Sequence, residues 1–513
     1  MKFSRHFLTL LSCVCAAAAL RAGHILIDDF DALVQALGSA VPGDTLLIED
    51  GVYDISGTWA LQVTADRVTI RGLRGSREAV IIRGRGMDAD GHHGFWVSGN
   101  DVTIQDLTVE NVRNHCIQTD IHTDGLTVRN CVLRDAGEQI LKVPCAEGDT
   151  DMCEGGLVED CLFEYSAGIG PRDYIGGIDC HFGRNWIVRR NIFKNITSPE
   201  NAPAEHAVHF WSWSENTLVE NNLIINCDRG IGFGLAGSGH VNGMIRNNII
   251  YHDVSSGGGF ADVSIEVYFS DDAWIYNNTV FQAHAGYFAG IKNWGGKRVS
   301  MVNNCVHMSD GFYGNLDQAL WVTAGGTGTV SHNEISTPDP SLFAAVDIPD
   351  AVRVDDVTDF LHIRDVSVSV LIDRGTSLLP DHPESFIDFD GDIRPQGAGV
   401  DIGADEYIMD TPVLSAGTVH VRDFRLYPNF PNPFNPATVI GYFLPVPSRI
   451  RAVVYDLNGH RIRILAHGRR HAGHGTFVWD GTDGEGMPAP SGLYMVVLDA
   501  GSFIASEKIL LIR

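Results

Sequence analysis

Short apolar–polar pairs recur along the middle of the chain and carry most of the residues that could do chemistry. The pairs are Ile117-Gln118, Leu141-Lys142, Ile178-Asp179, Val208-His209, Ile231-Gly232, Ile265-Glu266 and Ile291-Lys292. Two positions further on, six of these segments place Asp120, His181, Trp211, Gly234, Tyr268 and Trp294. Side chains alternate between the two faces of a β-strand. If these strands stack in register, one strand per repeat of the chain, they would therefore present two rows of side chains on one outer face. We expect the strand of Lys142 to be shifted by one residue relative to the others.

Such rows combine the groups needed to bind and cleave a sugar polymer that carries carboxylates. Aromatic rings pack on the apolar faces of sugars, while polar groups hold hydroxyls and carboxylates. β-Elimination of a uronate needs a base for the proton next to the carboxylate, and positive charge for the developing enolate. We predict catalytic roles, including the base, for Lys142, His181 and His209. We predict substrate binding by Asp179, Trp211, Arg229, Glu266, Tyr268, Lys292 and Trp294.

Details beside the rows complete this prediction. Arg229 lies in a connecting segment, and its guanidinium can bind a carboxylate bidentately. Gly232 and Gly234 have no side chains and would leave a flat notch beside His209. The cofactor stays undetermined: Ca²⁺ could share the charge stabilisation, while the Cys and His spacings do not match a zinc motif. We assign no metal ligands.

Two other functions stay open. A glycoside hydrolase needs two carboxyl groups about 5–9.5 Å apart. Asp179 and Glu266 would lie three coils, or roughly 14 Å, apart, which fits hydrolysis poorly. If the histidines are structural and the tryptophans are covered by loops, the protein would instead be a non-catalytic carbohydrate-binding or cell-surface adhesion protein.

The rows require a repeat of roughly thirty residues that runs through the middle of the chain. One apolar position recurs every 24 to 31 residues, at Ile104, Val128, Val158, Val188, Val219, Ile245, Ile275, Met301 and Val330. Each copy holds two short runs rich in Val and Ile, joined at Asn or Asp. Units this small must stack to bury an apolar face, which predicts a parallel β-solenoid with right-handed crossovers.

A polar column keeps step with this repeat. Asparagine occupies one position in six copies and cysteine in two earlier ones: Asn191, Asn222, Asn248, Asn278, Asn304, Asn333, Cys131 and Cys161. An Asn at a bend tolerates left-handed dihedrals, and its amide can bond the coils on either side. We expect the two cysteines to be buried or to form a bridge.

The repeat resembles the right-handed parallel β-helix superfamily, which includes pectate lyases and other secreted proteins that act on polysaccharides. Residues 40–53 resemble its entry coil, and residues 388–395 and 399–407 resemble its closing segment. The resemblance implies an all-β chain with a β-helix over residues 23–408. Among the activities of the superfamily, it favours a polysaccharide lyase. It assigns no catalytic residue, because the Asp pairs of polygalacturonases and the Arg signature of pectate lyases are not recognisable. Asp388-Phe-Asp-Gly-Asp also resembles a calcium loop, although a tight structural turn explains it better.

The last part of the chain has another pattern. We expect a linker over residues 409–425. A Pro-rich segment and short runs of alternating apolar and polar residues then predict a small immunoglobulin-like β-sandwich over residues 426–513. Asn432-Pro-Phe-Asn-Pro, Trp479-Asp-Gly and Ser491-Gly-Leu-Tyr are similar to C-terminal sorting domains of type IX secretion. That similarity implies that the secretion machinery is a partner of this domain.

The N-terminal segment and the net charge indicate where the protein is expected to be located. Lys2 and Arg5 precede a short apolar run and several alanines, a pattern that predicts a signal peptide over residues 1–22, with lipid attachment at Cys13 as the alternative. The formal charge of −27 argues against nucleic acid or an anionic membrane as a partner. No later segment reaches the ~20 apolar residues of a membrane span. We expect a monomer, secreted or attached to the cell surface, with a possible disulfide between Cys145 and Cys153.

Overall fold

The computed structural model describes most of residues 22–512. The residues outside the description are 1–21, 147–150, 236, 254–260, 310–314, 358, 365–369, 379–380, 408–423, 431, 436, 446–447, 458, 471–472, 485, 502 and 513. The predicted signal peptide except its last residue, Cys13, and most of the predicted linker therefore lie outside the described residues. Within the described ranges, no helix combines the length and the apolar character needed to cross a membrane.

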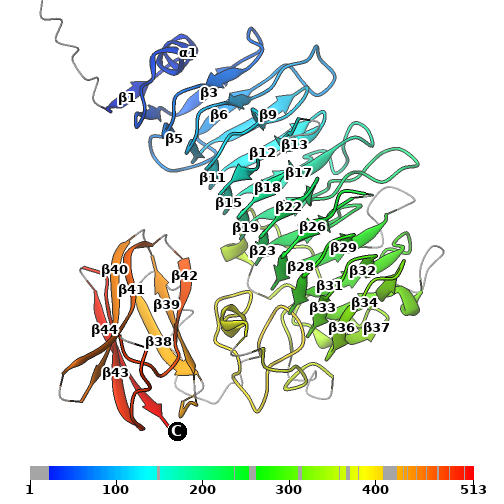
Figure 1. Ribbon diagram of the computed structural model, residues 1–513. Coiled ribbons are helices and arrows are strands. Elements are labelled where there is room, and N and C mark those ends of the chain that lie inside the picture. The colour runs from blue at the N-terminus through cyan, green and yellow to red at the C-terminus, as the bar shows by residue number, and fades with distance from the viewer. Residues whose placement is uncertain are drawn as a thin grey trace, which may run out of the picture.

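Three long parallel sheets form the larger part of the molecule (Figure 1). Sheet A contains β1 (His24–Ile27), β2 (Thr45–Ile48), β5 (Thr69–Gly72), β8 (Thr103–Gln105), β11 (Thr127–Arg129), β15 (Leu157–Glu159), β19 (Ile187–Arg189), β23 (Leu218–Glu220), β27 (Met244–Arg246), β30 (Trp274–Tyr276), β33 (Val299–Val302) and β36 (Gly328–Ser331). Sheet B contains β3 (Gly51–Asp54), β6 (Val80–Arg83), β9 (Thr108–Val112), β12 (Val132–Ala136), β16 (Leu162–Glu164), β20 (Ile192–Lys194), β24 (Leu223–Ile225), β28 (Ile249–His252), β31 (Thr279–Gln282), β34 (Cys305–Met308) and β37 (Glu334–Ser336).

Sheet C completes each coil. It contains β4 (Leu61–Val63), β7 (Phe95–Val97), β10 (Ile117–Thr119), β13 (Gln139–Val143), β17 (Gly176–His181), β21 (Val208–Trp211), β25 (Ile231–Phe233), β29 (Val263–Tyr268), β32 (Ala289–Trp294) and β35 (Leu320–Thr323). A short fourth sheet follows it in four coils, with β14 (Cys153–Glu154), β18 (Gly183–Arg184), β22 (Ser214–Glu215) and β26 (His240–Val241). The predicted parallel β-helix is confirmed, and the nine apolar repeat positions pair directly in sheet A.

One helix departs from the all-β prediction. Helix α1 (Phe30–Ser39) lies at the N-terminal end of the stack (Figure 1), where the first coil has no preceding coil. Asp29 caps it by accepting a hydrogen bond from the Ala32 amide at 2.7 Å. Leu33 and Leu37 are buried against the apolar core of the coils. The helix therefore covers the end of the core, the role that a terminal capping unit has in a repeat protein.

A buried asparagine ladder joins successive coils at the turn between sheets A and B. From Asn222 to Asn333, the Oδ1 atom accepts hydrogen bonds from the backbone N–H and Nδ2 of the Asn in the preceding coil; at Asn248 both distances are 3.0 Å. Asn191 Oδ1 accepts from the Cys161 amide instead. The bonds run without a break from Asn191 to Asn333. Cys161 continues the column, because its Sγ accepts from the Cys131 amide at 3.4 Å. No disulfide joins the described cysteines, so neither the Cys131–Cys161 bridge nor the Cys145–Cys153 bridge forms.

The left-handed turn and the ladder use adjacent residues. The positive φ belongs to the residue before the ladder position, as in Asn221 (54°), Asn247 (50°) and Asn277 (52°). Asparagine tolerates this conformation better than most residues. The expectation that one Asn does both tasks was therefore wrong, and the division of labour explains the paired asparagines in these repeats.

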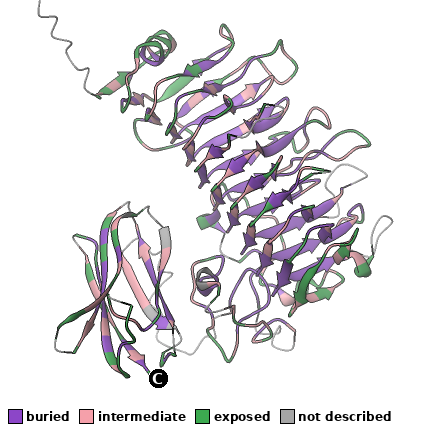
Figure 2. Ribbon diagram, in the orientation of Figure 1, coloured by how far each residue is buried: buried purple, intermediate pink, exposed green. Residues whose placement is uncertain are grey.

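The outer face of sheet B is covered by the closing segment, residues 337–407, drawn yellow in Figure 1. Its short helical turns are η2 (Pro340–Leu342), η3 (Val354–Asp356) and η5 (Pro383–Phe386), and η1 (Leu316–Gln318) precedes it in the last coils. Apolar residues that point out of the coils, such as Leu223 and Ile249, pack against Phe360 and Ile402 of this segment. From β16 to β34 consecutive residues of sheet B are buried (Figure 2), so both faces of these strands are covered and the strands carry two apolar residues in a row.

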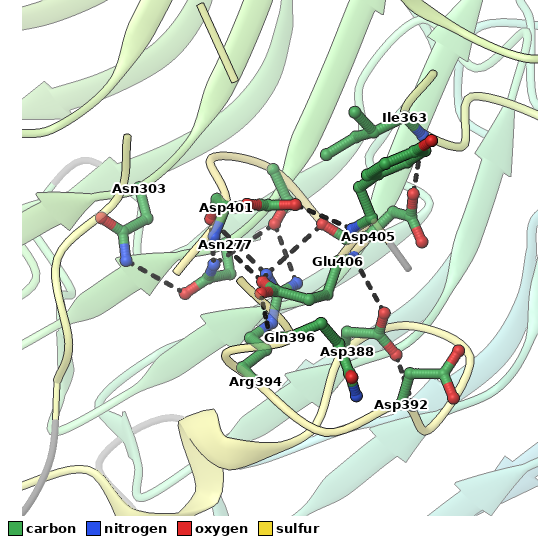
Figure 3. Close-up of polar contacts among 12 residues, drawn as sticks. Asn277, Asn303, Ile363, Asp388, Asp392, Arg394, Gln396, Asp401, Asp405 and Glu406 are labelled. Carbon is green, nitrogen blue, oxygen red and sulfur yellow. Dashed lines mark hydrogen bonds and ion pairs between the residues drawn. The ribbon is translucent and has the colours of Figure 1, made fainter. Parts of the chain in front are cut away.

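A buried polar network fixes the closing segment (Figure 3). The Arg394 guanidinium donates to the carbonyls of Gly403 (3.0 Å) and Ala404 (2.6 Å) and pairs with Glu406 at 3.1 Å. Asp388 Oδ1 accepts from the three backbone N–H groups of residues 390–392, at 2.7 to 3.0 Å, and its Oδ2 accepts from the Glu406 amide. The Asp388 carboxylate is thus engaged within a tight turn.

The C-terminal part is a small antiparallel sandwich. One sheet contains β38 (Arg425–Phe430), β39 (Thr438–Leu444) and β42 (Gly473–Trp479); the other contains β40 (Ser448–Asp456), β41 (Arg461–Arg470), β43 (Gly492–Asp499) and β44 (Ile504–Leu511). Its core surrounds the fully buried Trp479. Val439 also packs against Phe386 and Ile387, so the sandwich touches the closing segment.

The ladder predicts a position-dependent cost for removing an amide. Replacing Asn248 by alanine should lower the free energy of unfolding by about 2 kcal/mol or more, because buried donors and acceptors lose their partners. Asn333→Ala is the matched control, since the half-buried end of the ladder can bond water instead. Urea unfolding followed by tryptophan fluorescence measures both; equal losses would contradict a cooperative ladder.

Candidate active site on sheet C

The predicted outer row of sheet C is present in register. Lys142 lies opposite Gln118 and Asp179, and His209 lies opposite Asp179 and Gly232. The row continues through Gly232, Glu266 and Lys292, and the second row pairs His181 with Trp211 and Tyr268 with Trp294. Leu141 pairs directly with Ile117 and Ile178, so the expected one-residue shift at Lys142 does not occur.

Four of these side chains form a contact cluster in three adjacent coils. Lys142 Nζ forms an ion pair with Asp179 Oδ2 and lies 2.9 Å from His181 Nε2. His181 Nε2 lies 3.3 Å from the same Asp179 oxygen, and Trp211 Nε1 donates to the other oxygen at 2.7 Å. The His181 and Trp211 rings are 4.2 Å apart. Lys142 and His181 keep 13% and 16% of their side chains exposed, so a ligand can reach both.

Asp179 is the electrostatic centre of this cluster. Burial alone would raise its pKa, but the hydrogen bond with His181 and the charge of Lys142 outweigh burial and lower the pKa. The group is therefore an ionised carboxylate that holds an ammonium and an imidazole in fixed positions. His181 Nε2 lies within hydrogen-bonding distance of two groups with opposite needs, because the Lys142 ammonium can only donate and the Asp179 carboxylate can only accept. With its proton on Nε2 the ring donates to Asp179; with its proton on Nδ1, toward Cys145 Sγ at 3.7 Å, it accepts from Lys142 through Nε2.

His209 lies behind this cluster. It is 3% exposed, its Nε2 lies 3.2 Å from the Gly234 carbonyl oxygen, and its ring stacks on Trp211 at 5.6 Å. Burial lowers its pKa, so the ring is neutral. The structure thus places His209 next to the predicted site but removes it from the open surface.

The predicted notch at the glycines is filled. A Cβ on Gly232 would lie 2.6 Å from His206 Nε2, and one on Gly234 would lie 2.1 Å from the Tyr268 carbonyl oxygen. Sequence analysis missed His206, which comes from the loop before β21 and occupies the space that Gly232 leaves. A loop side chain folding back over a strand carries no periodic signal, so the repeat alone could not reveal it.

A second cluster lies further along the row. Lys292 Nζ pairs with Glu266 Oε1 at 2.8 Å and lies 5.0 Å from the centre of the Trp294 ring. Tyr268 stacks on Trp294 at 5.6 Å, and Trp321 meets Trp294 edge-on at 6.4 Å. Burial raises the pKa of Glu266, although Lys292 opposes the effect. Trp321 was missed, but Leu320-Trp321-Val322 extends the apolar–polar pattern by one coil and could have identified it.

Arg229 is engaged beside the row. Its Nε donates to Asp262 Oδ2 at 2.8 Å, and its Nη1 lies 3.6 Å from Glu205 Oε2. The three predicted cations Lys142, Arg229 and Lys292 are thus each paired with a carboxylate. An anionic ligand would have to share or displace these partners.

Comparison with known proteins bears on the fold and on the C-terminal domain. A family model described as the FlgD Ig-like domain matches residues 442–502. No curated protein matches the chain. Among solved structures the chain is similar to pectate lyase Pel9A (12% identity, 76% of this chain and 97% of that one, TM-score 0.41). It is also similar to an alginate lyase from Paenibacillus sp. str. FPU-7 (14%, 59% and 98%, TM-score 0.37) and a GH87 α-1,3-glucanase from Streptomyces thermodiastaticus strain HF3-3 (15%, 64% and 72%, TM-score 0.30). At these identities the likeness concerns the β-helix fold and assigns no activity.

The ionised state of Asp179 predicts a pH-dependent contribution to stability. Because its folded pKa lies below the usual value of about 3.9, the contribution is complete above pH 4 and is lost as the pH falls through the folded pKa. Asp179→Asn should therefore cost about 3 kcal/mol at pH 6. Denaturant unfolding between pH 3 and pH 6 should show the deficit shrinking as the solution becomes more acidic.

Glu266→Gln is the matched control for this series. The pKa of Glu266 is raised, so the wild type should lose stability relative to this variant as the pH rises. The same pH trend in both variants would show that the Asp179 carboxylate is not the electrostatic centre.

Proposed function

We propose that the β-helix binds an acidic polysaccharide along sheet C and cleaves it by β-elimination. The observation that carries this proposal is the contact cluster of Lys142, Asp179, His181 and Trp211. It combines a reachable cation, an imidazole that offers a lone pair at Nε2 in its Nδ1-protonated tautomer, and an aromatic ring in adjacent coils. Elimination needs a base and positive charge at one carboxylated sugar, and this cluster offers both within hydrogen-bonding distance of each other.

The roles follow from the positions of the side chains. His181 Nε2 takes the proton from the carbon next to the uronate carboxylate, and Asp179 stabilises the resulting imidazolium. Lys142 stabilises the charge that develops on the carboxylate. The electron pair of the broken C–H bond forms a C=C bond, the C–O bond to the leaving sugar breaks, and the leaving oxygen takes a proton from Lys142.

The aromatic cluster would bind another sugar of the same chain. Tyr268, Trp294 and Trp321 are half-buried, and Lys292 lies among their rings. From β17 to β29 the sheet advances three strands, or roughly 14 Å, which is a multi-sugar span. We therefore assign substrate binding to this cluster and chemistry to the Lys142 cluster, with Arg229 and its carboxylates between them.

Binding without catalysis is the second candidate. It is favoured by the pairing of Lys142 with Asp179 and of Lys292 with Glu266, because paired charges satisfy each other without a ligand. Hydrolysis is less well supported: Asp179 and Glu266 keep the separation expected from the repeat, beyond the ~9.5 Å limit for a pair of catalytic carboxyl groups.

We also propose that the chain is exported and that its C-terminal domain is a type IX sorting signal. The FlgD Ig-like match supports an immunoglobulin-like domain over residues 442–502, and the three sequence landmarks support the sorting role. The protein would then be secreted or held at the cell surface, where its polymer substrate is found.

An assay with uronate polymers tests the reaction. The purified chain should produce ultraviolet absorbance from the new C=C bond, and His181→Gln and Lys142→Met should each lower kcat at least about 100-fold. Lys194→Met on sheet B is the control, because that side chain lies on another face and should leave turnover unchanged. Retained binding of polymer without absorbance would favour the binding function, and new reducing ends without absorbance would favour hydrolysis.

The sorting role has its own test in a cell that carries a type IX system. Removing residues 424–513 should leave the β-helix on the periplasmic side of the outer membrane, while the full chain reaches the cell surface or the medium. Fractionation with an antibody against the β-helix measures this. Equal export of both forms would overturn the sorting role and leave the proposed reaction unaffected.

A further inference from the structure

Three side chains next to the row bring their ligand atoms together. One ligand atom from each of Glu205, His206 and His209 lies within 4.8 Å of the other two. His209 projects outward from β21, while Glu205 and His206 belong to the loop that leads into this strand. The loop bends before Val208, which allows residues three apart to converge although a regular strand would place them on opposite faces.

His206 is a buried imidazole without a hydrogen-bond partner. It is 4% exposed, and neither of its ring nitrogens makes a hydrogen bond with any described residue. The closest carboxylate oxygen is Glu266 Oε2, at 3.9 Å from Nε2. Burying an unsatisfied polar side chain costs about 1–3 kcal/mol, so such a group indicates a ligand that completes it.

His209 is oriented as a ligand. Its Nε2 lies 3.2 Å from the Gly234 carbonyl oxygen, so this nitrogen carries the proton and donates it. The Nδ1 lone pair is then the one available for coordination. Metal-binding histidines almost always donate their other ring N–H to a carbonyl or carboxylate in this way.

The backbone holds His206 in place. The amide of Glu205 donates to the Ile175 carbonyl at 2.8 Å, and the amide of Ala207 donates to the Arg229 carbonyl at 3.0 Å. The His206 carbonyl in turn accepts from the Gly177 amide at 3.1 Å. The His206 ring lies where Gly232 has no side chain. The ring is thus fixed between neighbouring coils, and ordering it would cost a bound ion little.

The other converging group in the described residues differs in this respect. His362, Asp390 and Asp405 also place ligand atoms together. There, His362 Nε2 pairs with Asp390 at 2.5 Å, and Asp405 Oδ2 accepts from the Ile363 amide at 2.6 Å. His362 Nδ1 has no hydrogen-bond partner among the described residues, but each of the three side chains is already engaged through another atom, whereas both nitrogens of His206 are unsatisfied.

We propose that Glu205, His206 and His209 bind a divalent transition metal of the Zn²⁺ class. Two imidazoles and one carboxylate suit Zn²⁺, Co²⁺ or Ni²⁺, whereas Ca²⁺ prefers oxygen ligands only. Bonds of about 2.0–2.2 Å in a tetrahedral shell require ligand atoms to come closer than 4.8 Å, which rotation of the partly exposed Glu205 side chain and small shifts of the two rings can supply. Glu205 is 35% exposed, so the fourth position faces solvent and can take water or a ligand oxygen. The inference concerns metal binding itself and does not depend on the proposed reaction.

Calorimetric titration of the full, untagged chain tests this inference after treatment with a chelator. Zn²⁺ should bind with a stoichiometry of one, Co²⁺ should give a visible ligand-field absorption, and Ca²⁺ should not compete. Glu205→Gln and His206→Phe should each weaken Zn²⁺ binding by at least the roughly 10–100-fold that loss of an outer-shell partner costs. Phenylalanine fills the buried space of His206 without its nitrogens, which keeps the fold intact.

Glu200→Gln is the matched control. It removes an exposed carboxylate from the same loop and should leave the affinity unchanged. Absence of a one-to-one Zn²⁺ or Co²⁺ complex in the wild type would overturn the site, and so would full affinity in both ligand variants. The readout is metal binding, so the result is independent of the lyase assay. A protein that binds the metal but does not cleave a uronate polymer would contradict the proposed reaction and leave the metal site standing.

Discussion

The register between successive coils is the constraint on which the rest of the molecule depends. Side chains alternate along a strand, so a slip of one residue would turn every core residue outward and every outer residue into the core. The buried asparagine ladder resists such a slip, because each amide oxygen must meet the backbone N–H one coil away. With register fixed, Lys142 and Asp179, 37 residues apart in sequence, become neighbours.

The outer faces of sheets A, B and C differ in character because the repeat varies the residues that point outward and keeps those that point into the core. On sheet B one outward column is apolar from β12 onward and packs against the closing segment, while a second column begins with charged residues, as where Arg134 pairs with Glu110 and Glu164. On sheet A the outward residues alternate in charge, as where Glu159 pairs with both Arg129 and Arg189. On sheet C they include lysine, histidine, carboxylates and aromatic rings. The core residues are alike on all three faces, so the outward positions decide whether a face packs against another segment, forms ion pairs or offers groups to a ligand.

The sequence predicted the side-chain positions that the repeat period determines and missed those that the connecting loops determine. The coil register, the rows of sheet C and the asparagine column follow from residues at fixed intervals, and stacking forces those residues together. His206 folds over Gly232 from a connecting loop, and the closing segment returns along sheet B instead of ending the stack; neither placement has a periodic signal. Helix α1 was missed because it lies before the repeat. The Cys131–Cys161 disulfide does not form, because the two residues are buried thiols and Cys161 Sγ accepts a hydrogen bond from the Cys131 amide.

The charge balance of sheet C connects the candidate site to the inferred metal. The chain carries a formal charge of −27, and the cations of the row are matched by carboxylates: Lys142 by Asp179, Lys292 by Glu266, and Arg229 by Asp262 and Glu205. An acidic polymer approaching such a face meets little excess positive charge. A divalent ion on Glu205, His206 and His209 would lie between the two clusters and add two positive charges there. It would also free Arg229 from part of its pairing with Glu205, so that a guanidinium and a metal could both face a uronate carboxylate in the middle of the row.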